Sequence, residues 1–433
     1  MLSLLPRFIY TLCFLLLLSP TQRCLSASDA VFLPLMKTAV PQSELFRPSN
    51  NKLPFRHNVS LTVTLTVGSP PQPVTMVLDT GSELSWLNCK KTLTTSSVFN
   101  PLQSKSFASI PCYSPVCRTR TRDFPIPVSC DPKKLCHFTL SYADMSSVDG
   151  NLASDTFRFG QSVFSKTVFG CMDSGQSTNP EEDSKTTGLL GLNLGSLSFV
   201  SQTGYAKFSY CIAARDSSGV LIFGEAKLGW LKPLRYTPLV RRTTRLPYFD
   251  RVAYTVQLEG IRVGNKQLSL PKTVFVPDHT GAGQTMVDSG TRFSFLLGPV
   301  YTALKTEFMA QTNKILRVYE DPNFVFEGAM DLCYRVPLGK PAPPLPMVTL
   351  MFSGAEMSVK GERLLYRVGN MVKGRDAIHC FTFGNSELLG VEAFIIGHHH
   401  QQNVWMEFDL QKSRVGFADV ECDVASQRLG LPR

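Results

Sequence analysis

Residues 76–82, with the sequence MVLDTGS, recur later in the chain as residues 285–291, with the sequence TMVDSGT. In each copy an apolar run leads into an aspartate, and a hydroxyl residue, a glycine and a second hydroxyl residue follow it. One such copy alone would be explained by a strand that runs into an Asx turn, where aspartate and glycine are common. Two matched copies instead indicate a duplicated structural unit that presents Asp79 and Asp288 as a pair.

Each copy is also followed, at nearly the same spacing, by two apolar residues and a glycine, at residues 189–191 and 395–397. The duplication therefore predicts two lobes of similar build. We place the N-terminal catalytic lobe at residues 58–238 and the C-terminal catalytic lobe at residues 239–433. The join is expected in the Pro- and Arg-rich stretch that begins at Pro238.

The repeated motif predicts a chemistry that needs neither a metal nor another cofactor. Glycine lets the backbone of each motif turn sharply and approach the other copy of the motif. The hydroxyl groups can hydrogen-bond to the carboxylate oxygens. Two aspartates a few ångströms apart share one proton, because both cannot be ionised cheaply. One carboxylate can then act as general base on water while the other carboxyl donates to a scissile carbonyl. We therefore expect Asp79 and Asp288 to be catalytic.

The fold class expected from the pattern is mostly β. Apolar residues alternate from Val59 to Val67 with the period of a half-buried strand. Short runs of the same kind recur along the chain, and the best helical pattern covers Gly298–Gln311.

The N-terminus predicts export. Residues 1–27 contain the apolar run Phe8–Leu18 behind Arg7, which is typical of a cleaved signal peptide. No segment has the length of a membrane span, so we expect no stable membrane insertion. Residues 28–57 are polar and show no regular pattern, so we expect a short pro-segment or a loose N-terminal extension there. The expected location is the secretory pathway, either the endoplasmic reticulum or the extracellular space and cell wall.

Cysteine usage agrees with export. Of the twelve cysteines, Cys13 and Cys24 fall in the expected signal peptide, and an even number remains, which suggests five disulfides. The cluster of four between Cys112 and Cys136 lacks the tight Cys-x-x-Cys pairs of zinc sites. Asn58, in the sequence Asn-Val-Ser, is a candidate for glycosylation.

The formal net charge is +10, but its lysines and arginines are dispersed, and no helix combines a basic stripe with aromatic residues. We therefore expect no nucleic-acid partner; polyanions outside the cell are the favoured nonspecific partners. The consecutive residues His398–His400 converge poorly on one metal ion and are expected in a turn.

These motifs resemble the pepsin-like aspartic protease family, and within it the plant nepenthesin-like group. The resemblance covers residues 59–422. It is carried by residues 79–82, 288–291, 142–144 and 402–409, together with the cysteine-rich insert from Cys112 to Cys136. Residues 81–87, with the sequence GSELSWL, are similar to the plant subgroup linked to cell survival in reproductive tissue. The resemblance implies a bilobal pepsin-like fold with a central cleft, a monomer, and peptide or protein substrates.

The resemblance also implies roles for individual residues. Tyr142 corresponds to the tyrosine of a hairpin flap that closes over the substrate, and Trp86 to the tryptophan whose indole N–H steadies the tyrosine hydroxyl. The two motifs supply the remaining support for the aspartates. Ser82 and Thr291 hydrogen-bond to the outer carboxylate oxygens. Thr80 and Ser289 brace the two loops, and Gly81 and Gly290 allow the loops to approach each other closely.

Several positions depart from the family pattern. Ala143 stands where glycine is common, Cys89 lacks its usual neighbouring cysteines, and His398 replaces an asparagine. Arg292 stands where a small hydroxyl residue is usual in the substrate cleft. If Arg292 faces the cleft, it should favour an acidic side chain in the substrate. Alternatively, it lies in solvent or pairs with an acid such as Glu83 or Asp144.

The resemblance further implies a disulfide pairing that the sequence alone does not yield. The expected bridges are Cys89–Cys171, Cys112–Cys136, Cys117–Cys130, Cys211–Cys422 and Cys333–Cys380.

Two other functions would explain part of these motifs. Some plant members of this fold are binding proteins that inhibit glycosidases, and loss of one catalytic aspartate marks many of them; here both aspartates are present. A glycosidase would explain two carboxylates but not the matched glycine and hydroxyl residues.

Overall fold

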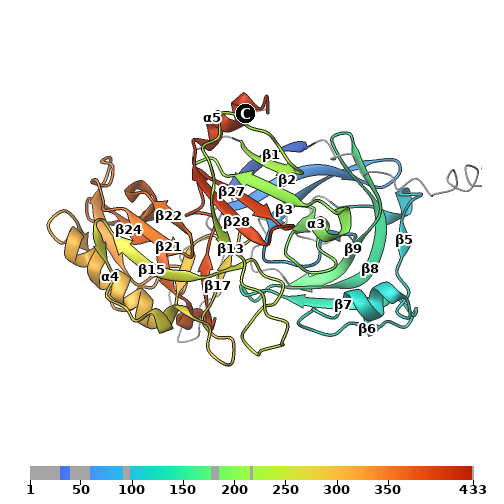
Figure 1. The fold of residues 1–433 in the computed structure, drawn as a ribbon, viewed down its shortest axis with the longest axis horizontal. Coiled ribbons are helices and arrows are strands. Elements are labelled where there is room, and N and C mark those ends of the chain that lie inside the picture. The colour runs from blue at the N-terminus through green and yellow to red at the C-terminus, as the bar shows by residue number, and fades with distance from the viewer. Residues whose placement is uncertain (1–29, 40–58, 91–97, 177–184, 215–217, 432–433) are drawn as a thin grey trace, which may run out of the picture.

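The computed structural model describes residues 30–39, 59–90, 98–176, 185–214 and 218–431. The chain forms two β-rich lobes joined by a band of strands (Figure 1). This arrangement confirms the expected fold class. The expected signal peptide and Asn58 lie outside the described residues. Within the described part of the chain, no helix is long and apolar enough to cross a membrane.

The larger sheet has fifteen strands and runs from the band of strands into the first lobe. In pairing order they are β13 (Arg235–Pro238), β28 (Arg414–Asp419), β27 (Val404–Asp409), β11 (Lys207–Cys211), β12 (Gly219–Phe223), β1 (Val31–Ala39), β2 (Val59–Val67), β3 (Gln72–Asp79), β10 (Gly188–Gly191), β4 (Trp86–Asn88), β9 (Ser162–Gln176), β8 (Ser147–Phe159), β7 (Cys136–Ser141) and β6 (Ser129–Cys130), with β5 (Ala108–Ser109) beside β8.

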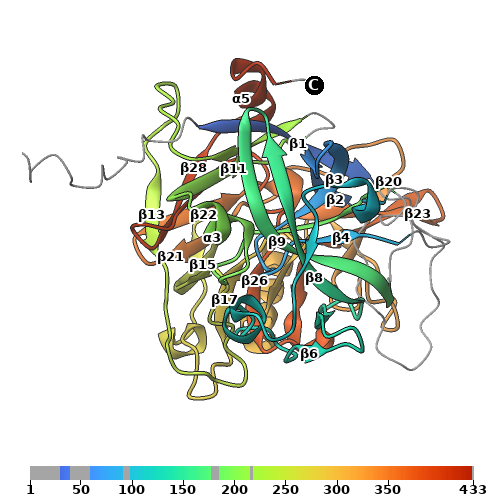
Figure 2. The ribbon, with the colours of Figure 1, turned by 90° about the vertical axis from the view of Figure 1, so that its right-hand side faces the viewer.

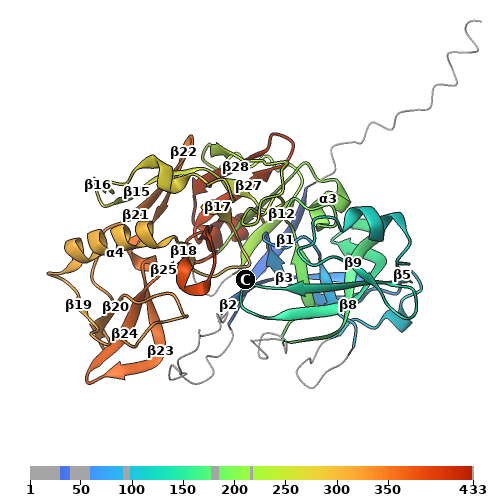
Figure 3. The same ribbon diagram turned by 90° about the horizontal axis from the view of Figure 1, so that it is seen from below.

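Three smaller sheets build the second lobe, which Figure 3 shows on the opposite side from β8 and β9. The first contains β14 (Thr255–Val256), β17 (Gln284–Val287), β26 (Ala393–Ile396), β18 (Ser294–Leu296) and β25 (Phe383–Asn385). The second contains β16 (Lys266–Gln267), β15 (Leu258–Val263), β21 (Val348–Phe352) and β22 (Ala355–Val359), and the third contains β19 (Arg317–Val318), β20 (Cys333–Pro337), β24 (Asp376–Phe381) and β23 (Leu365–Lys373).

Helices are few among the described residues. The longest of these, α4 (Gly298–Thr312), agrees with the helical pattern seen in the sequence, and its buried residues include Val300, Leu304 and Phe308. Two short α-helices are also described, α3 (Phe199–Thr203) and α5 (Cys422–Arg428).

Two segments lie elsewhere than the sequence suggested. Residues 31–39 form β1, which pairs with β12 on one side and β2 on the other, so this part of the expected loose extension has regular structure. Val31, Leu33 and Leu35 alternate and are buried, but the pattern is short and is interrupted by Pro34. At the other end of the chain, β27 and β28 return to the large sheet beside β11, away from the other strands of the second lobe.

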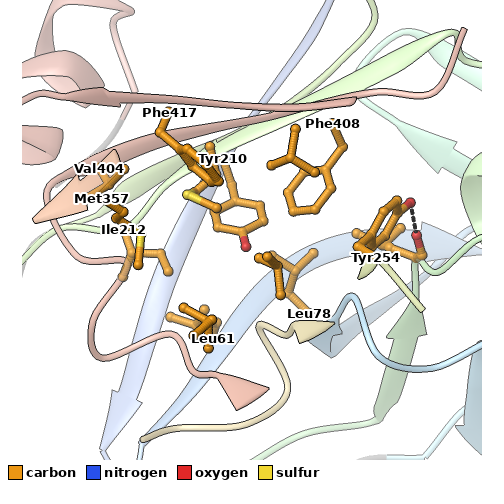
Figure 4. Packing of buried hydrophobic residues seen from close by; sticks show 14 of the residues in the cluster. Leu61, Leu78, Tyr210, Ile212, Tyr254, Met357, Val404, Phe408 and Phe417 are labelled. Carbon is orange, nitrogen blue, oxygen red and sulfur yellow. Dashed lines mark hydrogen bonds between the residues drawn. The ribbon is translucent and has the colours of Figure 1, made fainter. Parts of the chain in front are cut away.

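One core links the band of strands to the active-site region. Figure 4 shows Leu61, Leu78, Tyr210 and Phe408 packed together from β2, β3, β11 and β27. Nearby, the Tyr254 hydroxyl donates to the Leu192 carbonyl at 2.6 Å. The end of β3, where Asp79 lies, is therefore anchored in a buried apolar cluster that includes residues from both halves of the chain.

Five disulfides are present among the described residues. Three of them, Cys89–Cys171, Cys211–Cys422 and Cys333–Cys380, are those expected.

The other two correct the expected pairing in the insert. The bridges are Cys112–Cys130 and Cys117–Cys136, not Cys112–Cys136 and Cys117–Cys130. Cys112, Cys117 and Cys136 are all buried in the small core of the insert, and the exposed Cys130 of β6 pairs with Cys112. Loop closure costs change only slowly with loop length, so chain length could not select between the two schemes; the pairing is visible only in the folded insert.

Candidate active site

The two aspartates stand at equivalent ends of equivalent strands. Asp79 is the last residue of β3, and Asp288 directly follows β17. In each case a second strand runs parallel to the first: Gly191 of β10 pairs with Asp79, and Ile396 of β26 pairs with Val287. The repeated sequences therefore form pairs of parallel strands, and each pair places one aspartate at the end of a strand.

The glycines of both motifs let the aspartates meet. A Cβ atom added to Gly290 would collide with Oδ1 of Asp79, and one added to Gly81 would lie 2.9 Å from Oδ1 of Asp288. Each glycine thus lies against the carboxylate of the opposite motif. Any side chain at either position would push the two loops apart.

Asp79 is buried and tightly held. The Gly81 N–H donates to its Oδ1 at 2.7 Å, and the Ser82 hydroxyl donates to its Oδ2. Burial, followed by the nearby charge of Asp288, raises the pKa of Asp79 from 3.8 to about 7, although these hydrogen bonds oppose the shift. The pair therefore retains one proton over the acidic pH range.

The second motif repeats this support. Gly290 N–H donates to Oδ1 of Asp288 at 2.9 Å, and the Thr291 hydroxyl donates to Oδ2. The loops are also tied to each other, because Thr80 N–H donates to Ser289 Oγ at 3.0 Å and Ser289 N–H donates to Thr80 Oγ1 at 2.9 Å. All of these contacts match the roles that the sequence assigned.

Tyr142 and Trp86 are also brought together. Tyr142 begins the turn between β7 and β8, and the indole Nε1–H of Trp86 donates to its hydroxyl oxygen at 2.7 Å. Burial and the nearby charge of Asp79 raise the pKa of Tyr142, so the hydroxyl keeps its proton. The hairpin tip is closed by Met145 N–H, which donates to the Tyr142 carbonyl at 3.0 Å.

Two supporting residues were missed in the sequence. Gln401 is fully buried, and its side-chain amide donates to the backbone oxygens of Asp288 at 3.3 Å and Ile396 at 2.7 Å. Its side-chain oxygen accepts from the hydroxyl of Tyr210 in β11. No local pattern could reveal this link, because Tyr210 and Gln401 meet only through the packing of the large sheet against the Asp288 loop.

Arg292 lies away from bulk solvent. It is 3 % exposed, and its guanidinium carbon lies 4.3 Å and 4.7 Å from the ring centres of Tyr366 and Phe293. Burial excludes the solvent position, and among the described residues Arg292 forms no ion pair with Glu83 or Asp144, so both expected alternatives are wrong. A contact between Arg292 and the substrate stays a prediction.

The three histidines lie in the turn after β26. The ring of His400 hydrogen-bonds with Thr382 and Ser294, at 2.8 Å and 2.7 Å, and His399 Nε2 lies 3.0 Å from the carbonyl oxygen of Arg363. Burial lowers the pKa of His399 to about 3, so its ring stays neutral. These contacts place His399 and His400 in the packing of the turn.

Glu83 follows the first motif and is a second buried acid. It packs on Gly195, where an added Cβ would collide with its side chain. Burial, followed by the charge of Asp123, raises the pKa of Glu83 from 4.5 to about 8. Between these values the unfolded chain ionises at this position and the folded chain does not. The stability that Glu83 contributes is therefore full below about pH 4.5 and is lost as the pH rises through about 8.

Replacing Glu83 with glutamine should remove this pH dependence. We expect E83Q to be more stable than the wild type by about 2 kcal/mol at pH 8.5, and equal to it within about 0.5 kcal/mol at pH 4. Chemical denaturation at both pH values measures the difference, and Glu225→Gln, at an exposed glutamate, is the control. Equal shifts at both pH values would show that Glu83 does not titrate in this way.

Comparisons with known proteins agree with this geometry. The family model described as "Xylanase inhibitor N-terminal" matches residues 61–225, and "Xylanase inhibitor C-terminal" matches residues 253–419. The chain is 61 % identical over 407 residues to aspartic proteinase PCS1 of Arabidopsis thaliana, covering 92 % of this chain and 89 % of that protein. The chain belongs to the plant family of pepsin-like aspartic proteinases.

A second curated relative and a solved structure agree at lower identity. Aspartic proteinase nepenthesin-2 of Nepenthes gracilis is 28 % identical over 366 residues, covering 83 % of this chain and 77 % of that protein. Basic 7S globulin from soybean shares the fold, with a TM-score of 0.62 at 18 % identity over 90 % of this chain and 97 % of that one. Although the matched models are described as inhibitor domains, PCS1 and nepenthesin-2, which cover 92 % and 83 % of this chain, are proteinases, so this aspartic proteinase is an endopeptidase and the inhibitor alternative is not favoured.

Proposed function

We propose that Asp79 and Asp288 hydrolyse peptide bonds in protein substrates, with one carboxyl protonated and the other ionised. The observation that carries this proposal is the meeting of the two motifs: each glycine lies against the opposite carboxylate, and the pKa of Asp79 is raised to about 7. An acid and a base are thereby available side by side at acidic pH.

The reaction then follows from this arrangement. The pair holds one proton, so the carboxyl that is ionised takes a proton from water while the water oxygen attacks the peptide carbon. The protonated carboxyl gives its proton to the carbonyl oxygen, which yields a neutral tetrahedral diol. As the carbon–nitrogen bond breaks, the first carboxyl returns its proton to the leaving nitrogen, and the second recovers a proton from the diol. The dyad again holds one shared proton.

Digestion of a denatured protein mixture tests the activity. We expect cleavage at acidic pH that pepstatin abolishes, with internal cleavage sites read by mass spectrometry. Pepstatin-insensitive cleavage, or no cleavage at any pH between 3 and 6, would contradict the proposal.

The proposed location is the secretory pathway, and the proposed form is a monomer. Five disulfides among the described residues support the location, because such bridges persist in oxidising compartments.

The hydrogen bond from Trp86 to Tyr142 should matter for turnover. Trp86→Phe keeps an aromatic ring but removes the only donor of the side chain. We expect kcat/KM to fall by about tenfold, which is the cost of one lost hydrogen bond. Steady-state kinetics on a peptide substrate measure the effect. Trp405→Phe, at the buried tryptophan of β27, controls for the loss of ring size; a similar loss in both variants would argue for packing alone.

Arg292 provides a test of substrate choice. If the guanidinium contacts the substrate, the wild type should cleave library peptides with an acidic residue two or three positions before the scissile bond up to about tenfold faster, and Arg292→Thr should lose this preference. The preference should also weaken with added salt. Equal preferences in both enzymes, with lower thermal stability of the variant, would assign Arg292 to packing against Phe293 and Tyr366.

A further inference from the structure

Seven arginines gather where the cysteine-rich insert meets the segment between the lobes. Three alternate along the insert, and four lie in residues 241–251. We call this set the arginine surface: Arg118, Arg120, Arg122, Arg241, Arg242, Arg245 and Arg251. Figure 2 shows the two segments side by side in the lower part of the view, the insert in teal and the connecting segment in yellow-green.

Direct contacts hold the two segments together. Arg251 forms an ion pair with Asp123 of the insert, and Nη2 of Arg245 lies 4.0 Å from the same carboxylate. Arg245 also donates to the backbone carbonyl of Arg122. Asp123 therefore serves as the shared counterion of two arginines.

The charge of this surface is poorly balanced. Arg118, Arg122, Arg241 and Arg242 are exposed, and among the described residues the ion pairs at this surface all fall on Asp123. The neighbouring Glu83 adds no negative charge at acidic pH, because burial raises its pKa to about 8. With seven arginines against the carboxylates of Asp123 and Asp250, this surface therefore carries a net positive charge at acidic pH.

Aromatic rings lie among the arginines. Tyr113 is 62 % exposed, and the guanidinium carbon of Arg118 lies 5.2 Å from its ring centre. Tyr248 is 54 % exposed in the connecting segment, next to Phe249, over which Arg242 lies at 5.6 Å. Exposed tyrosines offer an apolar face with a polar edge, which suits the C–H face of a sugar ring.

We propose that the arginine surface binds an acidic polysaccharide whose sugars carry carboxylates. A guanidinium group matches a carboxylate with two parallel hydrogen bonds, and a row of arginines matches a polymer with one charge per sugar. The partner rests on the proposed secretory location, where such polymers are available outside the cell. The binding would keep the proteinase near the polymer without involving Asp79 or Asp288.

Binding to immobilised polygalacturonate at pH 5.5 tests the proposal. The test variant is R122Q/R241Q/R242Q, which spares Arg245 and Arg251 because they hold the two segments together. The matched control is K314Q/R317Q/R375Q, which removes the same charge from exposed positions of the second lobe. We expect the test variant to bind at least about tenfold more weakly at ~0.1 M salt and the control to change by less than about twofold.

Other outcomes have defined meanings. An equal loss in both variants would show that net charge alone drives binding and would overturn the proposal. Tighter binding to RNA or to phosphatidylserine vesicles than to polygalacturonate would overturn the choice of partner. Methyl-esterified polygalacturonate, which lacks the charges, should not bind. The Asp288→Asn variant should bind like the wild type, so a failure of the proposed catalytic mechanism leaves this test intact.

Discussion

Replacing Asp288 with asparagine is expected to lower kcat/KM by at least about a thousandfold, and Asp79→Asn should do the same. Asparagine keeps the size of the side chain, but it can neither accept the proton of water nor share a proton with its partner. The hydrogen bonds from Gly290 and Thr291 to Oδ1 and Oδ2 of Asp288 show that both oxygens are held in place. The fold should therefore survive the change while the chemistry stops.

Kinetics on a peptide substrate, together with the thermal midpoint of each variant, check this expectation. Asp173→Asn, at an exposed position of β9, controls for the general effect of losing one carboxylate. Activity above about one hundredth of the wild-type value in either dyad variant would show that the assignment is wrong. Loss of activity together with unfolding would require the comparison to be repeated at a lower temperature.

The second large effect that we expect is a loss of activity as the pH rises above about 7. The raised pKa of Asp79 keeps the shared proton on the dyad up to about pH 7, where burial and the charge of Asp288 no longer hold it. Above that value both carboxyls are ionised and no acid remains to protonate the carbonyl oxygen. Activity should therefore fall by about tenfold for each further pH unit.

A profile of kcat/KM from pH 3 to pH 9 measures this fall in activity. The protein should be shown to stay folded over the range, because Glu83 also weakens the folded state as the pH rises through about 8. The E83Q variant separates the two effects: its activity should decline at the same pH as that of the wild type. A maximum at pH 8 would contradict a dyad that needs one proton.

The sequence was sufficient for the fold class, for the duplicated lobes and for the residues of the dyad. These features were readable because they are local or repeated: the strand pattern of residues 59–67, the motifs at Asp79 and Asp288, and the apolar pairs that precede Gly191 and Gly397. The family resemblance added Tyr142 and Trp86, and the structure joins them by a hydrogen bond.

The tertiary structure alone decided what depends on packing between distant segments. The insert disulfides depend on how the four cysteines are arranged in the folded insert, since loop length hardly distinguishes the two schemes. Residues 31–39 form a regular strand because they pair with β12 on one side and with β2 on the other. Likewise, Arg292 is buried against two aromatic rings, and Tyr210 reaches Gln401, through contacts that no local pattern encodes. Local sequence thus determined the two carboxylates and their nearest hydrogen-bond donors, because each motif carries both, whereas long-range packing determined the residues that support them.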